Sequence, residues 1–184
     1  MNLEQLKTPL RVDQIDFRIQ SINLGGYATI LAYKDARADM QRLDEAVGPL
    51  NWKREHTRDN HNCVVSIWDE SKSQWVSKED TGTESNTEKE KGLASDSFKR
   101  ACFNWGIGRE LYDYPAIEVK LHPDEFEIKE DKGKKRAFAK WGLKPNNWIW
   151  HSVFEEGVLV YLAAKDEKSI RYEYGSREAA KRNK

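Results

Sequence analysis

The sequence predicts an α+β fold in which an antiparallel β-meander is packed by one long helix. Three strand-like segments follow one another without an intervening helix, at residues 51–58, 63–69 and 74–82. An amphipathic helix follows them, and its apolar residues share one face. A helix placed after a run of paired strands is typical of α+β proteins. The expected core is therefore β-β-β-α.

The first part of the chain predicts a short helix, an extended segment, a strand and a second helix. Pro9 interrupts the helical spacing near the N-terminus. A glycine pair then marks a turn, and the β-branched and aromatic residues 27–33 favour a strand. Asp35 is placed to cap a helix that ends at Gly48.

The meander and the long helix are the best-defined part of the pattern. Residues 70–73 separate the last two strand-like segments and indicate a hairpin turn. The apolar stripe of the helix consists of residues at helical spacing: Ala94, Phe98, Ala101, Cys102 and Trp105. Lys99 is expected at the flank of this stripe and Arg100 on the outer face. Asp96, four residues before Arg100, is placed to pair with it.

The segment after Pro115 is expected to be β-rich. A strand at 116–121 is followed by a charged loop that extends to about Lys140. Two further strands flank a Glu-Gly turn, and another covers 169–175. A short helix capped by Ser176 ends the pattern.

The overall charge does not point to a nucleic-acid partner, because 31 Lys and Arg residues balance 31 Asp and Glu residues. Local charge is more informative. Basic residues gather at 129–140 and 181–184, whereas acidic residues gather at 124–127. This separation could give a neutral protein one basic face, although a solvated loop and tail would show the same pattern.

Other features argue against several classes of protein. Cys63 and Cys102 are far apart and have no CxxC partner, which argues against a disulfide framework and a cysteine-rich zinc site. No apolar run approaches about 18 residues and no signal peptide follows Met1, so a cytoplasmic protein without a membrane partner is expected. No Walker-type glycine loop is present, and no cofactor is expected.

The stretch "GLASDSFKRACFNWGIGRELYD" resembles the signature of the Rad-fifty-two family of single-strand annealing proteins, in the variant of Sak-like phage recombinases. The matching positions are Ala94, Ser95, Asp96, Ser97, Phe98, Lys99, Arg100, Ala101, Trp105, Gly106, Gly108, Leu111, Tyr112 and Asp113. The upstream order of elements also fits, so the resemblance covers roughly residues 27–115. Residues 81–92 are shorter and more acidic than the family pattern, and the region after Pro115 matches nothing in it.

The resemblance implies a protein that anneals complementary single strands of DNA without ATP. Members form homo-oligomeric rings or arcs, whose outer groove holds the phosphate backbone and leaves the bases exposed. Lys99 and Arg100 match the basic pair that lines this groove. A further basic residue of the family aligns at Ala38, beside Arg37, and Arg37 is the corresponding candidate. The chemistry agrees, because annealing needs cations that neutralise phosphates and few contacts to bases.

Residues of the meander could add to this surface. Three basic residues on its first strand could extend the track of cations: Lys53, Arg54 and Arg58. Trp68 and Trp75 are expected in the core rather than as stacking platforms, because tryptophans on strands are usually buried.

The expected organisation has three segments. Residues 1–26 form an N-terminal arm that contacts neighbouring subunits, 27–115 form the annealing core, and 116–184 form the β-rich part with its charged loop and a frayed tail. A role in homologous recombination and DNA repair makes a host or phage single-strand-binding protein a further expected partner.

Two other functions remain open. Asp113, Glu118 and Lys120 imitate the metal site of a nuclease, although a third acidic ligand is not evident. The histidines within residues 56–61 imitate a zinc loop, but a polar turn explains them as well. Alternatively, the protein could bind and protect DNA ends without annealing them. The expected protein is not an enzyme.

Overall fold

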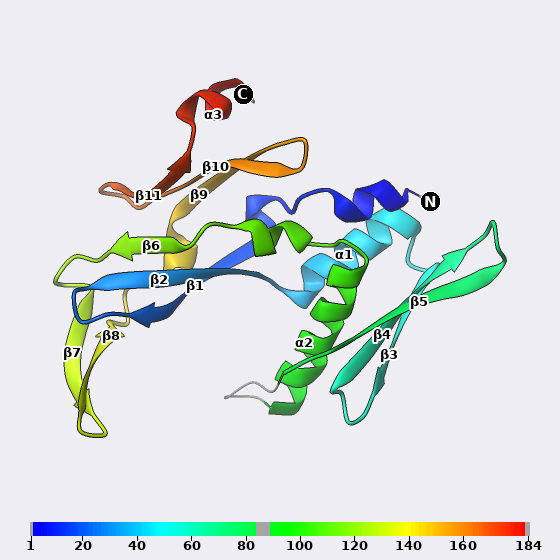
Figure 1. Ribbon diagram of the computed structural model, residues 1–184, viewed down its shortest axis with the longest axis horizontal. Coiled ribbons are helices and arrows are strands. Elements are labelled where there is room, and N and C mark those ends of the chain that lie inside the picture. The colour runs from blue at the N-terminus through cyan, green and yellow to red at the C-terminus, as the bar shows by residue number, and fades with distance from the viewer. Residues whose placement is uncertain (1, 84–88, 183–184) are drawn as a thin grey trace. The chain divides into compact units, whose positions relative to one another are not determined.

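The computed structural model describes residues 2–83 and 89–182 and divides the chain into two compact units (Figure 1). Unit 1 comprises Met1–Leu10 and Lys34–Arg109, and unit 2 comprises Arg11–Tyr33 and Glu110–Lys184. Each unit is therefore built from two separate stretches of the chain. The division expected from the sequence, into an arm at 1–26, an annealing core at 27–115 and a β-rich part at 116–184, concerns function and stays a prediction.

Unit 1 contains the β-meander and the long helix. Its elements are η1 (Leu3–Lys7), α1 (Ala36–Val47), β3 (Trp52–Thr57), β4 (Asn62–Asp69), β5 (Gln74–Thr81) and α2 (Lys89–Asn104). The three strands form one antiparallel sheet in the order β3-β4-β5, and α2 packs on β4 and β5. The predicted α+β class and its meander-and-helix core are confirmed. Of the polar segment before α2, residues 84–88 lie outside the described part of the chain.

Alternation along the strands builds the core of unit 1. Val65 and Ile67 on β4 are buried, and so are Phe98, Ala101 and Cys102 on α2. The apolar stripe read from the sequence therefore does face the sheet. Burying a large side chain such as Phe98 contributes about 1.5–3 kcal/mol to the free energy of unfolding.

Local sequence sets both ends of α1. The Asp35 side chain accepts a hydrogen bond from the Arg37 amide at 2.6 Å, as expected for an N-cap. Gly48 ends the helix with a φ of 86°, a conformation that favours glycine. Arg42 then ties α1 to the first turn of the chain, because its guanidinium donates to the carbonyls of Gln5 and Thr8.

Unit 2 is mostly β-structure. Its elements are η2 (Val12–Gln14), β1 (Ile15–Ile22), β2 (Tyr27–Lys34), η3 (Arg109–Asp113), β6 (Ile117–Lys120), β7 (Phe126–Asp131), β8 (Lys134–Ala139), η4 (Pro145–Asn147), β9 (Ile149–Glu155), β10 (Val158–Lys165), β11 (Ile170–Gly175) and α3 (Arg177–Arg182). Two end residues of these elements, Lys34 of β2 and Arg109 of η3, belong to unit 1. They form the sheets β1-β2-β6 and β11-β10-β9 and the hairpin β7-β8. The predicted strands here and the Ser176 cap of α3 are confirmed, because Ser176 Oγ accepts from the Glu178 amide at 3.2 Å.

The charged loop expected up to Lys140 is wrong, because this stretch forms the antiparallel hairpin β7-β8. Its turn has Lys132 at φ 51° and Gly133 at φ 73°, the two positive φ values of a two-residue hairpin turn. The charged residues on both strands obscured the alternation that a hairpin requires. The Lys132-Gly133 pair between two short strand-like segments was the sequence signal that could have identified this hairpin.

Tryptophans organise the core of unit 2. The Trp150 ring stacks on Phe17 with 3.6 Å between ring centroids, and Trp148 lies beside Trp150 at 6.1 Å. Both tryptophans are buried, whereas Trp141 is 90% exposed. None of the helices in residues 2–83 and 89–182 is long and apolar enough to span a membrane.

Candidate nucleic-acid interface

The basic pair on α2 contacts carboxylates on two different elements. The Lys99 ammonium lies 3.8 Å from Asp96, and the Lys99 side chain is 23% exposed. Arg100 Nε lies 3.4 Å from Asp80 on β5, and the Arg100 side chain is 41% exposed. The expected pairing of Asp96 with Arg100 is therefore wrong. Asp96 instead accepts from the amide and hydroxyl of Thr83.

Arg37 and Lys99 meet at one carboxylate, that of Asp35. Arg37 forms an ion pair with Asp35 at 2.9 Å. Hydrogen bonds from Arg37 and the nearby charge of Lys99 outweigh burial, so that the pKa of Asp35 is lowered. The start of α1 thus holds Arg37 against Asp35, whose carboxylate also feels the charge of Lys99.

Lys53 and Arg54 point to opposite faces of the meander, because neighbouring residues of a strand alternate. The Arg54 guanidinium lies 4.7 Å from the Phe98 ring, on the side of the sheet covered by α2. The Lys53 ammonium lies 4.7 Å from the Trp75 ring, on the other side. These two residues cannot extend one continuous track of cations.

The turn that begins at Arg58 lies against α2. In this turn, between β3 and β4, Arg58, Asp59 and Asn60 all have positive φ, near 50°, 50° and 70°. Ser97 on α2 donates a hydrogen bond to the Asn60 carbonyl at 3.0 Å and so holds this turn against the helix. The cations around α2 are therefore Arg54, Lys99 and Arg100. The turn that begins at Arg58 packs on α2, Arg37 lies beside Asp35 at the start of α1, and Lys53 lies on the other face of the meander.

The prediction that Trp75 lies in the core is wrong, because its side chain is 39% exposed. Trp75 pairs across the strands with Trp68, and their rings meet edge to face at 5.5 Å. Lys53 covers the same ring. The register between β4 and β5 places this cluster on the face of the meander away from α2. Strand alternation from Val65 would have placed Trp68, three residues later, on the opposite face of the meander, and Trp75 pairs with Trp68 there.

A buried ion pair joins the end of β2 to α1 and was not predicted from the sequence. Lys34 and Asp39 form a salt bridge with side chains at most 1% exposed. Lys34 also donates to the Ile107 carbonyl at 2.8 Å and lies 3.9 Å from the Phe103 ring. Burial outweighs the charge of Lys34 and raises the pKa of Asp39 to about 6.

The glycine turn after α2 has a structural role at this ion pair. Gly108 has a φ of 72°, and a Cβ placed there would lie 2.8 Å from Lys34 Cδ. A side chain at this position would displace the lysine. Gly108, one of the glycines that carry the family resemblance, therefore also leaves room for the buried cation.

The lysine of the residues that imitate a nuclease site is engaged in other contacts. The Lys120 ammonium donates to the Gly25 carbonyl and lies 4.4 Å from the Tyr27 ring. Within the described residues, Asp113 and Glu118 belong to no group of three or more His, Cys, Asp or Glu side chains that could hold a metal ion.

Comparison with known proteins gives one significant relationship that bears on function. The chain is similar to the single-stranded DNA-binding protein DdrA of Deinococcus radiodurans, with 39% identity over 90 residues. The match covers 48% of this chain and 43% of that protein, so the chain spans less than half of its relative's length. No protein-family model matches the chain, and no solved structure matches it significantly. The two proteins are distant homologues over the matched stretch.

Proposed function

We propose that the protein binds single-stranded DNA and anneals complementary strands in homologous recombination and DNA repair, without ATP or a metal ion. The similarity to a protein named for single-stranded DNA binding carries this proposal. The cations around α2 support it, because a rigid helix presents Lys99 and Arg100 at a fixed spacing to phosphates. The protein is in this view a binding protein and not an enzyme.

Phosphates would replace the carboxylates that now pair with these cations. The contacts of Lys99 with Asp96 and of Arg100 with Asp80 are 3.4–3.8 Å long and partly exposed. Exposed pairs of this kind contribute only about 0–1 kcal/mol, so exchanging a carboxylate for a phosphate costs little. Arg100 can in addition hold a phosphate with two parallel hydrogen bonds. Binding through the backbone leaves the bases available to a complementary strand.

We further propose that the protein acts as a homo-oligomeric ring or arc of the Sak-like type, with the N-terminal arm at the contacts between subunits. Exposed apolar side chains support assembly, since Leu3 and Leu24 in the arm are 46% and 53% exposed and Leu50 is 89% exposed. Sedimentation at micromolar concentration tests this, and a strict monomer would contradict it. A single-strand-binding protein of the host or phage is a further proposed partner.

The central experiment measures annealing of complementary oligonucleotides without ATP or metal. Lys99→Ala with Arg100→Ala should slow annealing by at least about tenfold, as expected when two phosphate contacts are lost. Thermal unfolding should shift by only a few degrees, because substitutions outside the core usually change stability by about 0.5 kcal/mol. Lys72→Ala removes a positive charge from the β4–β5 turn of unit 1, outside the N-terminal arm, and should anneal normally.

Normal annealing by the double variant would show that α2 is only a packing helix. The affinity of the unmodified protein should fall with salt, with a slope of about −0.7 per neutralised phosphate on a log–log plot. Binding without annealing would favour a DNA-end-protecting protein, and cleavage of DNA that requires a divalent metal would favour a nuclease.

A further inference from the structure

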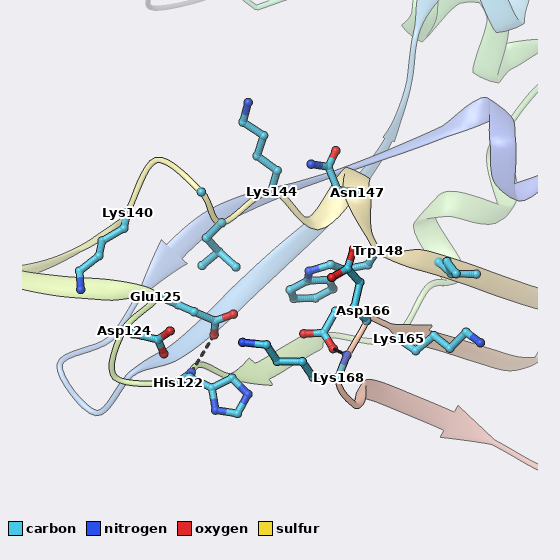
Figure 2. Close-up of a pocket in the computed structure, with 14 residues that line it drawn as sticks. His122, Asp124, Glu125, Lys140, Lys144, Asn147, Trp148, Lys165, Asp166 and Lys168 are labelled. Carbon is cyan, nitrogen blue, oxygen red and sulfur yellow. Dashed lines mark hydrogen bonds between the residues drawn. The ribbon is translucent and has the colours of Figure 1, made fainter.

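Unit 2 contains a recess of about 860 Å³ that the cations around α2 do not line (Figure 2). Lys140 and Lys144 come from the segment after β8, whereas Lys165 and Lys168 come from the end of β10 and the turn before β11. Figure 2 shows these two pairs on different sides of Trp148. The recess is thus an open hollow with lysines on more than one edge.

These four lysines, the rim lysines, have no carboxylate partner among residues 2–83 and 89–182. Within the described part of the chain, none of the four forms an ion pair, although carboxylates are present in the same recess. Two of these carboxylates already have a cation, because Arg171 lies 2.7 Å from Glu125 and 2.6 Å from Asp166. Asp124 and Glu167 also line the recess and reduce its positive charge. Charge alone would therefore give only a weak anion site.

Trp141 supplies a second kind of contact at the same edge. Its side chain is 90% exposed, and it lies in sequence between Lys140 and Gly142, both of which line the recess. The Lys144 ammonium is 4.9 Å from its ring centroid. An exposed tryptophan among unpaired cations offers a flat apolar surface beside sites for phosphate. Unpaired nucleic-acid bases stack on such surfaces, and bases inside a duplex cannot.

We propose that this recess is a second contact for single-stranded DNA, in which a base stacks on Trp141 at one edge and phosphates lie against Lys140 and Lys144 at that edge and against Lys165 and Lys168 at another. The choice of ligand rests on the proposed function, but the residues are distinct from those around α2. Stacking tolerates any base, so this contact adds affinity without sequence preference.

The first test uses Trp141→Ala, Trp141→Phe and the unmodified protein, with oligothymidylate of about 16 nucleotides at low salt. Trp141→Ala should weaken binding by about fivefold or more, whereas Trp141→Phe keeps a ring and should retain most of the affinity. Thermal unfolding should be unchanged in both variants, because the side chain is almost fully exposed.

The second test separates the rim lysines from general charge. Lys165→Gln with Lys168→Gln should reduce the salt slope by about 1.4, which corresponds to two phosphate contacts. Lys134→Gln with Lys135→Gln removes the same charge from β8, outside the recess, and should leave the slope unchanged.

The outcomes distinguish this inference from the proposed function. If the recess variants bind as the unmodified protein does while Lys99→Ala with Arg100→Ala binds weakly, the recess is not a DNA contact and the role of α2 stands. If only the recess variants bind weakly, the recess stands and the role of α2 is wrong. Equal weakening of duplex binding by Trp141→Ala would overturn the stacking contact. No binding of oligothymidylate by the unmodified protein would overturn both.

Discussion

Lys34 in unit 1 and Arg171 in unit 2 are both buried beside an aromatic ring, but the surroundings of the two cations differ. In unit 1, Lys34 pairs with Asp39, and both side chains are cut off from water. In unit 2, the Arg171 side chain is 3% exposed, but its partners Glu125 and Asp166 are 18% and 19% exposed. The Trp148 ring lies 4.6 Å from the guanidinium.

Because of this difference in access to water, the pKa values of the partner carboxylates shift in opposite directions. Burial raises the pKa of Asp39 to about 6 in spite of Lys34. Burial also opposes ionisation of Asp166, but hydrogen bonds from Arg171 and from the amides of Ser169 and Lys168 outweigh it and lower the pKa of Asp166 to about 2. A buried ion pair therefore stabilises its charged form when the carboxylate keeps some water and several donors.

Removing the cation of unit 1 should have the largest effect. Lys34→Met leaves Asp39 buried without its partner and should cost about 3–5 kcal/mol in the free energy of unfolding at neutral pH. Denaturant unfolding measures this loss. Lys34→Met with Asp39→Leu removes both charges and should recover much of it. If the single variant is as stable as the unmodified protein, the pair is not buried in solution.

Removing the cation of unit 2 should cost less. Arg171→Met leaves Glu125 and Asp166 with partial access to water, so the expected loss is about 1.5–3 kcal/mol, the range of one hydrogen bond to a charged group. Glu125→Gln removes the charge of one partner of Arg171 but keeps its shape, so it should reduce the free energy of unfolding by less than Arg171→Met does. A loss larger than that of Lys34→Met would contradict the proposed importance of water access.

The two units should respond to pH in opposite directions. Because the folded-state pKa of Asp39 is raised above its usual 3.8, folded unit 1 binds more protons, and its stability should fall by roughly 3 kcal/mol as pH rises from about 4 to about 6. The pKa of Asp166 is lowered, so folded unit 2 binds fewer protons and should lose stability as pH falls from about 4 to about 2.

Hydrogen exchange of amides in α1 and in β10, corrected for the intrinsic effect of pH, resolves the two units. Asp39→Asn should abolish the slope between pH 4 and 6 in unit 1 only. If the stability of unit 1 still fell between pH 4 and 6 in Asp39→Asn, a group other than Asp39 would cause that pH dependence.

The smallest expected effect concerns the surface cations. Asp80→Asn weakens the pairing of Arg100 and makes its guanidinium more available to phosphate, so single-stranded DNA should bind about twofold to fivefold more tightly. Stability should change by about 0.5 kcal/mol or less. Asp69→Asn, which releases Lys72 in the β4–β5 turn, is the matched control. Weaker binding by Asp80→Asn would mean that the carboxylate orients Arg100 rather than competes for it.

The sequence predicted the parts of the fold that depend on local spacing. The cap at Asp35, the end of α1 at Gly48 and the apolar stripe of α2 are properties of short segments, and all three are confirmed. The hairpin β7-β8 was missed because charged residues hide its alternation.

The candidate site depends on contacts that sequence spacing cannot show. Asp80 reaches Arg100 from β5, 20 residues away along the chain, and this pairing requires the packing of α2 on the sheet. The opposite orientations of Lys53 and Arg54 follow from strand alternation, but assigning each face required knowing which one α2 covers. The buried Lys34 is unexpected because lysine is rarely buried.

The two free cysteines lie in the core between α2 and the meander, and their burial has a practical consequence. Burial raises the pKa of Cys63 to about 11 and that of Cys102 well above its usual range, so neither offers a thiolate to the solvent at neutral pH. An alkylating reagent can reach them only when α2 separates from the sheet. Their rate of labelling is therefore a natural reporter of this opening, and a cysteine introduced on the surface could carry a fluorophore while both native thiols remain in place.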